Sequence, residues 1–279
     1  PAAAATSRRG HRRAPHRPRR VMAGPIWFDI AGDGTNPTML LIHGSMDRSA
    51  GLLRLARRLD DAHRVVRIDR RGYGRSTDVG PPWTIEANVD DVETLSTAIG
   101  GPVDVVGHSL GGNVALALAA RRPDLVRSVV VYETPLSWLE WWPGDSAGAA
   151  AMSAASPPEA SEAFVRRLVG DEKWEQLPES TRARRRAEGA ALVAELADLR
   201  RAAPWVPEAV EAPVLALRGE HGRPHHRRGT EWLGAQLDRC RVSIVPGAGH
   251  AGPHTHAAEV AAEVVAFLSS LPTARRGVG

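Results

Sequence analysis

Short apolar runs alternate with amphipathic stretches in the first and last parts of the chain. The apolar runs are rich in β-branched residues, as buried strands are. We expect strands at residues 26–30, 38–42, 64–69, 102–106, 129–132, 213–217 and 241–245. We expect helices at residues 52–59, 84–99, 112–120, 230–237 and 258–271. This alternation predicts an α/β fold with a mostly parallel central sheet and helices on both faces.

The alternation stops between residues 136 and 206, where no strand pattern is visible. Residues 187–201 carry Leu192, Leu196 and Leu199 at helical spacing, which predicts an amphipathic helix. Five of the eight tryptophans fall in this region, at positions 138, 141, 142, 174 and 205. We therefore expect a helical cap at 136–206, inserted into an α/β core formed by residues 22–135 and 207–273.

Charge is unevenly distributed along the 279 residues. The net charge of +4 arises from the first 20 residues, which hold seven arginines and no acid, so the remainder carries +4 − 7 = −3. Residues 1–21 are therefore expected to form a disordered basic tail, and the body shows no nucleic-acid-binding pattern. No apolar run is long enough to cross a bilayer, and Cys240 is the only cysteine. We expect a cytoplasmic monomer or homodimer that binds a small-molecule substrate, with no nucleic-acid or membrane partner.

The stretch most informative about chemistry is Gly107-His108-Ser109-Leu110-Gly111, a G-x-S-x-G motif. It lies between a predicted strand and a predicted helix, where a serine is held in a strained turn with its hydroxyl exposed. The N–H of Leu110 at the helix start would face a developing oxyanion. Ser109 is therefore the predicted nucleophile.

A serine needs a base to remove its proton, and His250 is the predicted one. It follows the last predicted strand in a glycine-rich loop, whereas His221, His254 and His256 lack that context. Ser45, in the turn after an early strand, is the predicted second oxyanion donor. Six side chains are expected to line the substrate pocket: His43, Met46, His108, Trp138, Trp141 and Trp142.

Several segments together carry a family resemblance: 43–44, 69–76, 107–111 and 246–250. Through them the chain resembles the α/β-hydrolase fold family from about residue 26 to residue 271. In most members the triad acid is an aspartate a few residues after the strand at 214–217, but here Gly222 occupies that place. Two other carboxylates could serve as the triad acid in place of that aspartate. Glu133 ends the preceding strand, where certain haloalkane dehalogenases place the acid, and is favoured; Glu220 in the usual loop is the alternative.

The resemblance implies a serine hydrolase that cleaves a carboxylic ester, lactone or thioester through an acyl-enzyme on Ser109. The tryptophan-rich cap predicts that the substrate is apolar and of small to medium size. Two alternatives stay open: a cofactor-free C–C bond hydrolase or haloperoxidase-like enzyme, and a non-catalytic ligand-binding protein, which the missing aspartate motivates. No cofactor is expected. No metal site is expected either, because the histidine-rich run at 221–226 lacks a carboxylate at helical spacing.

Overall fold

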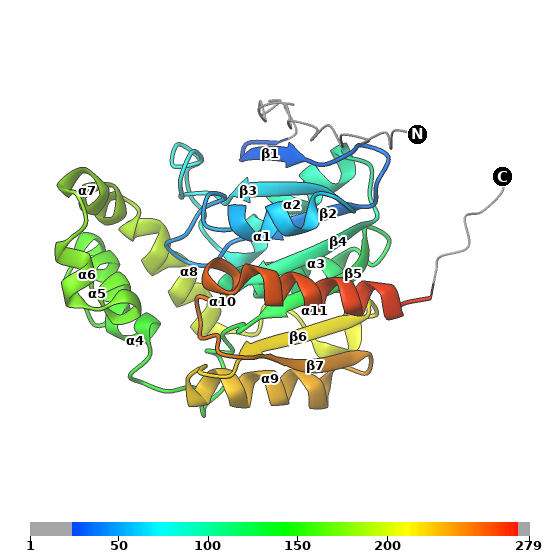
Figure 1. Ribbon diagram of the computed structural model, residues 1–279. Helices are drawn as coiled ribbons and strands as arrows, with labels where there is room; N and C mark the ends of the chain where they lie inside the picture. Colours follow the sequence, from blue (N-terminus) through cyan, green and yellow to red (C-terminus); the bar gives the residue numbers. More distant parts are fainter. Residues whose placement is uncertain (1–23, 273–279) are drawn as a thin grey trace, which may run out of the picture.

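The computed structural model describes residues 24–272, and within them a seven-stranded sheet forms the centre of the molecule (Figure 1). Its strands follow the order β1-β3-β2-β4-β5-β6-β7. Their bounds are β1 Trp27–Ala31, β2 Thr38–Ile42, β3 Arg64–Asp69, β4 Val103–His108, β5 Val126–Tyr132, β6 Val214–Gly219 and β7 Cys240–Val245. Only β1 runs antiparallel to its neighbour, so the expected mostly parallel sheet is confirmed.

Helices cover both faces of the sheet because successive strand residues point to opposite sides. Leu40 and Ile42 of β2 belong to the apolar layer beneath α2 (Ile85–Ala98), α3 (Leu110–Arg121) and α9 (Pro224–Gln236). Met39 and Leu41 pack in the opposite layer, beneath α1 (Leu53–Leu59) and α11 (Ala257–Ser270). A strand apolar on both faces is typical of a buried parallel sheet.

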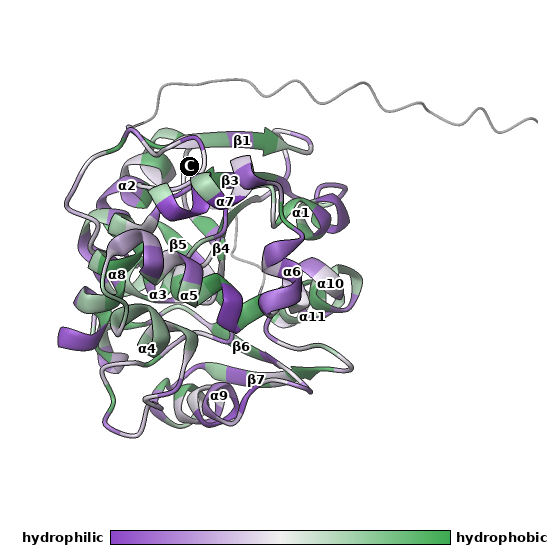
Figure 2. Ribbon diagram, turned by 90° about the vertical axis from the view of Figure 1, so that its left-hand side faces the viewer, coloured by the Kyte–Doolittle hydropathy of each residue, from purple (hydrophilic) through white to green (hydrophobic). Residues whose placement is uncertain are grey.

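Helices occupy most of the chain between β5 and β6 and lie beyond the carboxyl ends of the parallel strands (Figures 1 and 2). They are α4 Ala147–Met152, α5 Pro157–Val169, α6 Asp171–Glu175, α7 Glu179–Ala187 and α8 Gly189–Arg201, followed by a short 3₁₀ turn at Pro207–Ala209. Their own apolar core contains Phe164, Trp174 and Leu192. We refer to α4–α8 as the cap. The expected tail at 1–21 lies outside the described residues.

A buried ionic network ties the cap to the core. Glu195 of α8 accepts hydrogen bonds from Arg70 Nη1 (2.9 Å) and from the Tyr73 hydroxyl (2.7 Å), both from the loop after β3. Arg70 also bonds Asn88 and the His43 carbonyl, so its charge is fully coordinated. Burial and the nearby carboxylate raise the pKa of Tyr73 well above its usual value, which keeps the phenol a donor.

Within residues 24–272, each helix is too short or too polar to traverse a bilayer.

Candidate active site

The turn at Ser109 has the strained geometry that the motif predicts. Ser109 has φ 52° and ψ −125°, and its N–H donates to the Tyr132 carbonyl (2.9 Å). The flanking glycines leave no room for side chains: a Cβ on Gly107 would lie 2.4 Å from the Gly111 oxygen, and one on Gly111 would lie 2.4 Å from the Ile42 oxygen. The sequence thus needs glycine at both positions to bring strand, helix and serine together.

Glu133 and His250, far apart in the chain, meet beside the turn. The Nδ1 atom of His250 lies 2.8 Å from Oε2 of Glu133, and the other carboxylate oxygen accepts a hydrogen bond from the N–H of Gly219 (2.9 Å). Glu133 is 1% exposed and its backbone N–H donates to the Leu217 carbonyl (2.9 Å). A carboxylate held this way fixes the imidazole with Nδ1 protonated and Nε2 free to accept a proton.

The structure explains why Gly222, in the loop after β6, replaces the aspartate that the family resemblance leads us to expect there. A Cβ on Gly222 would lie 2.3 Å from Oε1 of Glu133, so the Glu133 carboxylate fills the space beside this position. Glu220 is exposed, and its Oε2 accepts a hydrogen bond from the N–H of Gly247 (2.8 Å). The structure therefore brings Glu133, and not Glu220, into contact with His250.

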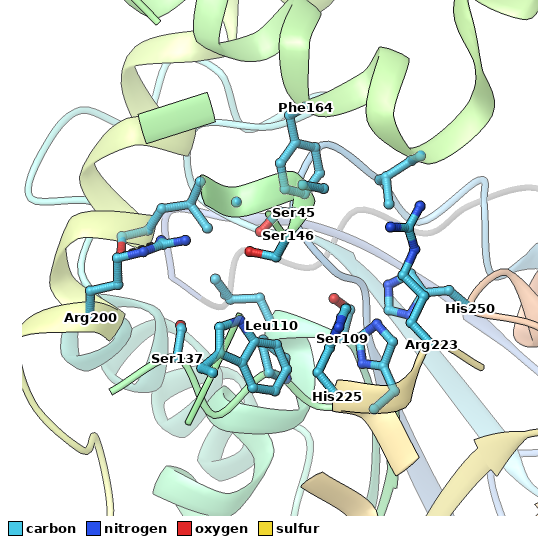
Figure 3. Close-up of a pocket in the computed structure, with 17 residues that line it drawn as sticks. Ser45, Ser109, Leu110, Ser137, Ser146, Phe164, Arg200, Arg223, His225 and His250 are labelled. Atoms are coloured by element: carbon cyan, nitrogen blue, oxygen red, sulfur yellow. Dashed lines mark hydrogen bonds between the residues drawn. The ribbon is translucent and has the colours of Figure 1, made fainter. Parts of the chain in front are cut away.

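A pocket opens between the sheet and the cap (Figure 3). Ser109 and His250 line it together with Ser45 and Leu110. Further apolar wall is formed by Pro135, Trp142, Phe164, Leu168 and Leu196. Among the hydrogen bonds of residues 24–272, none joins the Ser109 hydroxyl to His250; such bonds are often long without substrate and tighten when it binds.

Three polar or flexible side chains expected in the pocket lie elsewhere. His43 is fully buried, with its Nε2 accepting from the Arg70 N–H (2.9 Å), because it holds the neighbouring loop in place. Met46 has φ 57° and packs in the apolar core shared with the cap. His108 points to the loop of His250, whose carbonyl it contacts through Nε2 (2.9 Å).

Of the three tryptophans expected in the pocket, only Trp142 lines it. Trp138 packs edge-on against Trp205, with ring centroids 5.8 Å apart. Trp141 is partly buried against the core, with the Arg228 guanidinium 4.4 Å from its ring centre. The sequence pattern does not reveal which of these tryptophans faces the pocket.

Several polar side chains of the site were not singled out from the sequence, and two of them, His226 and Arg200, bear on its chemistry. His226 stacks on His250, with ring centroids 4.6 Å apart and planes 10° apart, and its Nε2 lies 3.8 Å from Oε2 of Glu133. Burial and the adjacent His250 hold the pKa of His226 well below its usual value, so this ring stays neutral. Arg200 also lines the pocket, and burial lowers its pKa. The histidine-rich run at 221–226 was the sequence signal that could have pointed to His226. No sequence signal pointed to Arg200.

The described part of the chain contains two clusters of possible metal ligands. In each cluster, three possible ligand atoms lie within 4.8 Å of one another. The first consists of Glu133, His226 and His250, in which the His250–Glu133 hydrogen bond already occupies two of the groups. The second consists of Asp47, His108 and His254 and lies outside the pocket lining.

The sequence of this chain is similar to those of known hydrolases. A sequence model described as the alpha/beta hydrolase family matches residues 39–263. A 2-(acetamidomethylene)succinate hydrolase from Mesorhizobium japonicum is 40% identical over 118 residues, which are 41% of this chain and 42% of that protein. Lipase LipV from Mycobacterium tuberculosis is 44% identical over 96 residues, 34% of this chain and 36% of that protein. These alignments span less than half of either relative.

Solved structures extend the similarity over most of the chain. A membrane phospholipase A described as a bacterial virulence factor has a TM-score of 0.71 and 26% identity, covering 89% of this chain and 84% of that one. The crystal structure of E-2-(acetamidomethylene)succinate hydrolase has a TM-score of 0.65 and 26% identity, covering 91% of this chain and 99% of that one.

Proposed function

Because the chain belongs to the alpha/beta hydrolase family, we propose that it is a serine hydrolase that cleaves a carboxylic ester, lactone or thioester through an acyl-enzyme on Ser109. The observation that carries the proposal is the hydrogen bond of His250 Nδ1 to buried Glu133, beside a strained serine in the same pocket. This arrangement has the parts of a nucleophile, a base and an orienting acid.

Acylation begins with attack of the Ser109 Oγ on the substrate carbonyl carbon while Nε2 of His250 accepts the hydroxyl proton. Glu133 stabilises the resulting imidazolium through Nδ1. The N–H groups of Ser45 and Leu110, both at the pocket wall, are the proposed donors to the oxyanion. Collapse of the tetrahedral intermediate expels the alcohol or thiol, which takes the proton from His250.

Deacylation repeats these steps with water as the nucleophile. His250 removes a proton from water, the hydroxide adds to the acyl carbonyl, and the same N–H groups stabilise the oxyanion. The intermediate then releases the carboxylic acid, and the proton returns to Ser109. Each step uses atoms supplied by this chain, the substrate and water.

We further propose that the substrate carries a carboxylate in addition to its apolar part. Arg200 lies across the pocket from His250 (Figure 3), and its one hydrogen bond within residues 24–272 is to the Leu196 carbonyl (3.1 Å). A half-buried guanidinium with no carboxylate partner is costly unless a ligand supplies the anion. The Mesorhizobium relative is named for a succinate derivative, which is consistent with this proposal. This proposal adds an acidic group to the small to medium apolar substrate that the tryptophan-rich cap predicts.

Covalent labelling tests the nucleophile. A fluorophosphonate probe should add one adduct mass to the wild-type protein and none to Ser109→Ala. Absence of an adduct in folded wild-type protein would favour the ligand-binding alternative. Turnover of a β-diketone without any ester turnover would favour the C–C hydrolase alternative.

A pair of matched esters tests the role of Arg200. We expect Arg200→Met to lower kcat/KM for a 4-nitrophenyl hemisuccinate by roughly tenfold or more, the loss typical of a hydrogen bond to a charged group. Turnover of 4-nitrophenyl butyrate should change by less than about threefold, and Arg200→Lys should retain part of the preference. Equal losses on both esters would contradict carboxylate recognition.

A further inference from the structure

Three side chains from separate parts of the fold converge on a second cluster outside the catalytic pocket. Asp47 belongs to the loop after β2, His108 ends β4, and His254 lies in α10 (Gly252–Thr255). One possible ligand atom from each lies within 4.8 Å of the other two. None of the three lines the pocket that holds Ser109.

The hydrogen bonding of His108 leaves one of its ring nitrogens with an unused lone pair. Its Nε2 faces the His250 carbonyl at 2.9 Å, and because a carbonyl only accepts, Nε2 carries the proton. The Nδ1 atom is therefore an acceptor in the neutral ring, yet it is buried and no group within residues 24–272 donates a hydrogen bond to it. His108 is 7% exposed, so water does not reach this acceptor.

Asp47 presents a second unpartnered acceptor. Its Oδ2 is buried and has no hydrogen-bond partner among the described residues, although His254 Nε2, which would form an ion pair with it when protonated, lies 3.3 Å away. The two atoms are thus close but misaligned for a hydrogen bond. A proton on His254 could satisfy at most one of the two unpartnered acceptors, whereas a cation between the three groups would satisfy all of them.

The spacing and the surroundings fit a small divalent ion. Ligand atoms about 2.1 Å from a tetrahedral zinc ion lie roughly 3.4 Å apart, close to the separation of Asp47 Oδ2 and His254 Nε2. A metal-ligating histidine usually donates its other N–H to a carboxylate or backbone carbonyl, as His108 does to His250. Asp47 and His254 are partly exposed, whereas His108 is buried.

We propose that Asp47, His108 and His254 form a binding site for a divalent transition-metal ion of the zinc type, with water completing its coordination. The ion would cross-link three loops: one carries Ser45, one continues into Ser109, and one carries His250. Its role is to hold these loops in register, and no chemical step passes through it. The site is independent of the proposed hydrolysis, because metal binding and ester turnover are measured separately.

Titration of chelator-treated full-length protein with zinc chloride tests the site, with bound zinc measured by equilibrium dialysis. Cobalt chloride adds a visible absorption band that reports tetrahedral coordination. We expect Asp47→Asn and His254→Gln, both at partly exposed positions, to weaken binding by at least roughly tenfold, the range seen when support for a metal site is lost. His226→Gln, in the other cluster, and His256→Gln, two residues from His254, should keep the wild-type affinity.

Thermal unfolding supplies a second measurement. Saturating zinc should raise the Tm of the wild-type protein by mass action and raise that of Asp47→Asn by clearly less at the same zinc concentration. The proposal is overturned if the wild-type protein shows no saturable binding. It is equally overturned if Asp47→Asn and His254→Gln bind zinc as the wild type does, or if binding depends on His226.

Discussion

Replacing Glu133 with glutamine would isolate the contribution of its charge. The side chain is fully enclosed, with one oxygen on the Gly219 N–H and the other on His250 Nδ1. In Glu133→Gln the amide oxygen can keep the Gly219 bond only if its NH₂ group faces His250. The ring must then accept at Nδ1 and carry its proton on Nε2, where it can no longer take the proton of Ser109.

The expected loss follows from that tautomer change. An equivalent change in a serine protease triad lowers kcat about 10⁴-fold, or about 5.5 kcal/mol of transition-state stabilisation. We expect Glu133→Gln to reduce kcat by a similar factor with KM changed little, measured on a 4-nitrophenyl ester. Urea unfolding establishes that the variant is folded. The matched control is Glu220→Gln, which removes an exposed carboxylate and should keep activity within about twofold.

A double substitution tests whether the triad acid can be moved from position 133 to position 222. Because a Cβ on Gly222 points at the Glu133 carboxylate, an aspartate there should reach His250 once Glu133 is removed. We expect Glu133→Gly/Gly222→Asp to recover roughly 100-fold of the activity lost in Glu133→Gly, a fraction of the full effect above. Glycine suits position 133, where φ is 47°. Full activity in Glu133→Gln, or a loss as large in Glu220→Gln, would refute this assignment of the acid.

Two further predictions concern stability. Glu195→Gln leaves the Arg70 guanidinium buried without its counter-charge, so the free energy of unfolding in urea should fall by about 3–5 kcal/mol; a change below about 1 kcal/mol would contradict the role of this network. Burial holds the pKa values of three histidines well below 6.5: His43, His108 and His226. Below pH 6.5 the unfolded state therefore binds protons that the native state does not. Stability should therefore be constant above about pH 7.5 and fall below pH 6.5 by up to roughly 1.4 kcal/mol per pH unit for each histidine; an unchanged urea midpoint at pH 5.5 would contradict this.

The strands could be read from the sequence because each is a short apolar run between turns. The clearest departure is β5, which begins at Val126, whereas the apolar run begins at residue 129. The added residues include Arg127 and Ser128, polar side chains that bond Asp104 of β4. Because these polar side chains interrupt the apolar pattern, the first residues of β5 could not be predicted from the sequence.

The candidate site was predictable where the backbone dictates it. Ser109 and Glu133 follow strand ends, and the parallel sheet brings such ends to one edge, so their proximity follows from topology. The direction of a side chain does not follow from topology. His43 and His108 also lie at that edge, yet both face interior loops instead of the pocket, because each is held there by a backbone hydrogen bond.

The position of Glu133 has a consequence for exchanging parts between related hydrolases. This carboxylate stands at the junction where the chain leaves β5 for the cap, three residues before Leu136. A crossover placed directly after Tyr132 would transfer the acid together with the lid-like segment. In a host whose own acid follows β6, such a chimera would have two competing carboxylates, and the reciprocal chimera would have none. Recombination can shuffle caps of this kind without loss of the acid only at breakpoints downstream of Glu133.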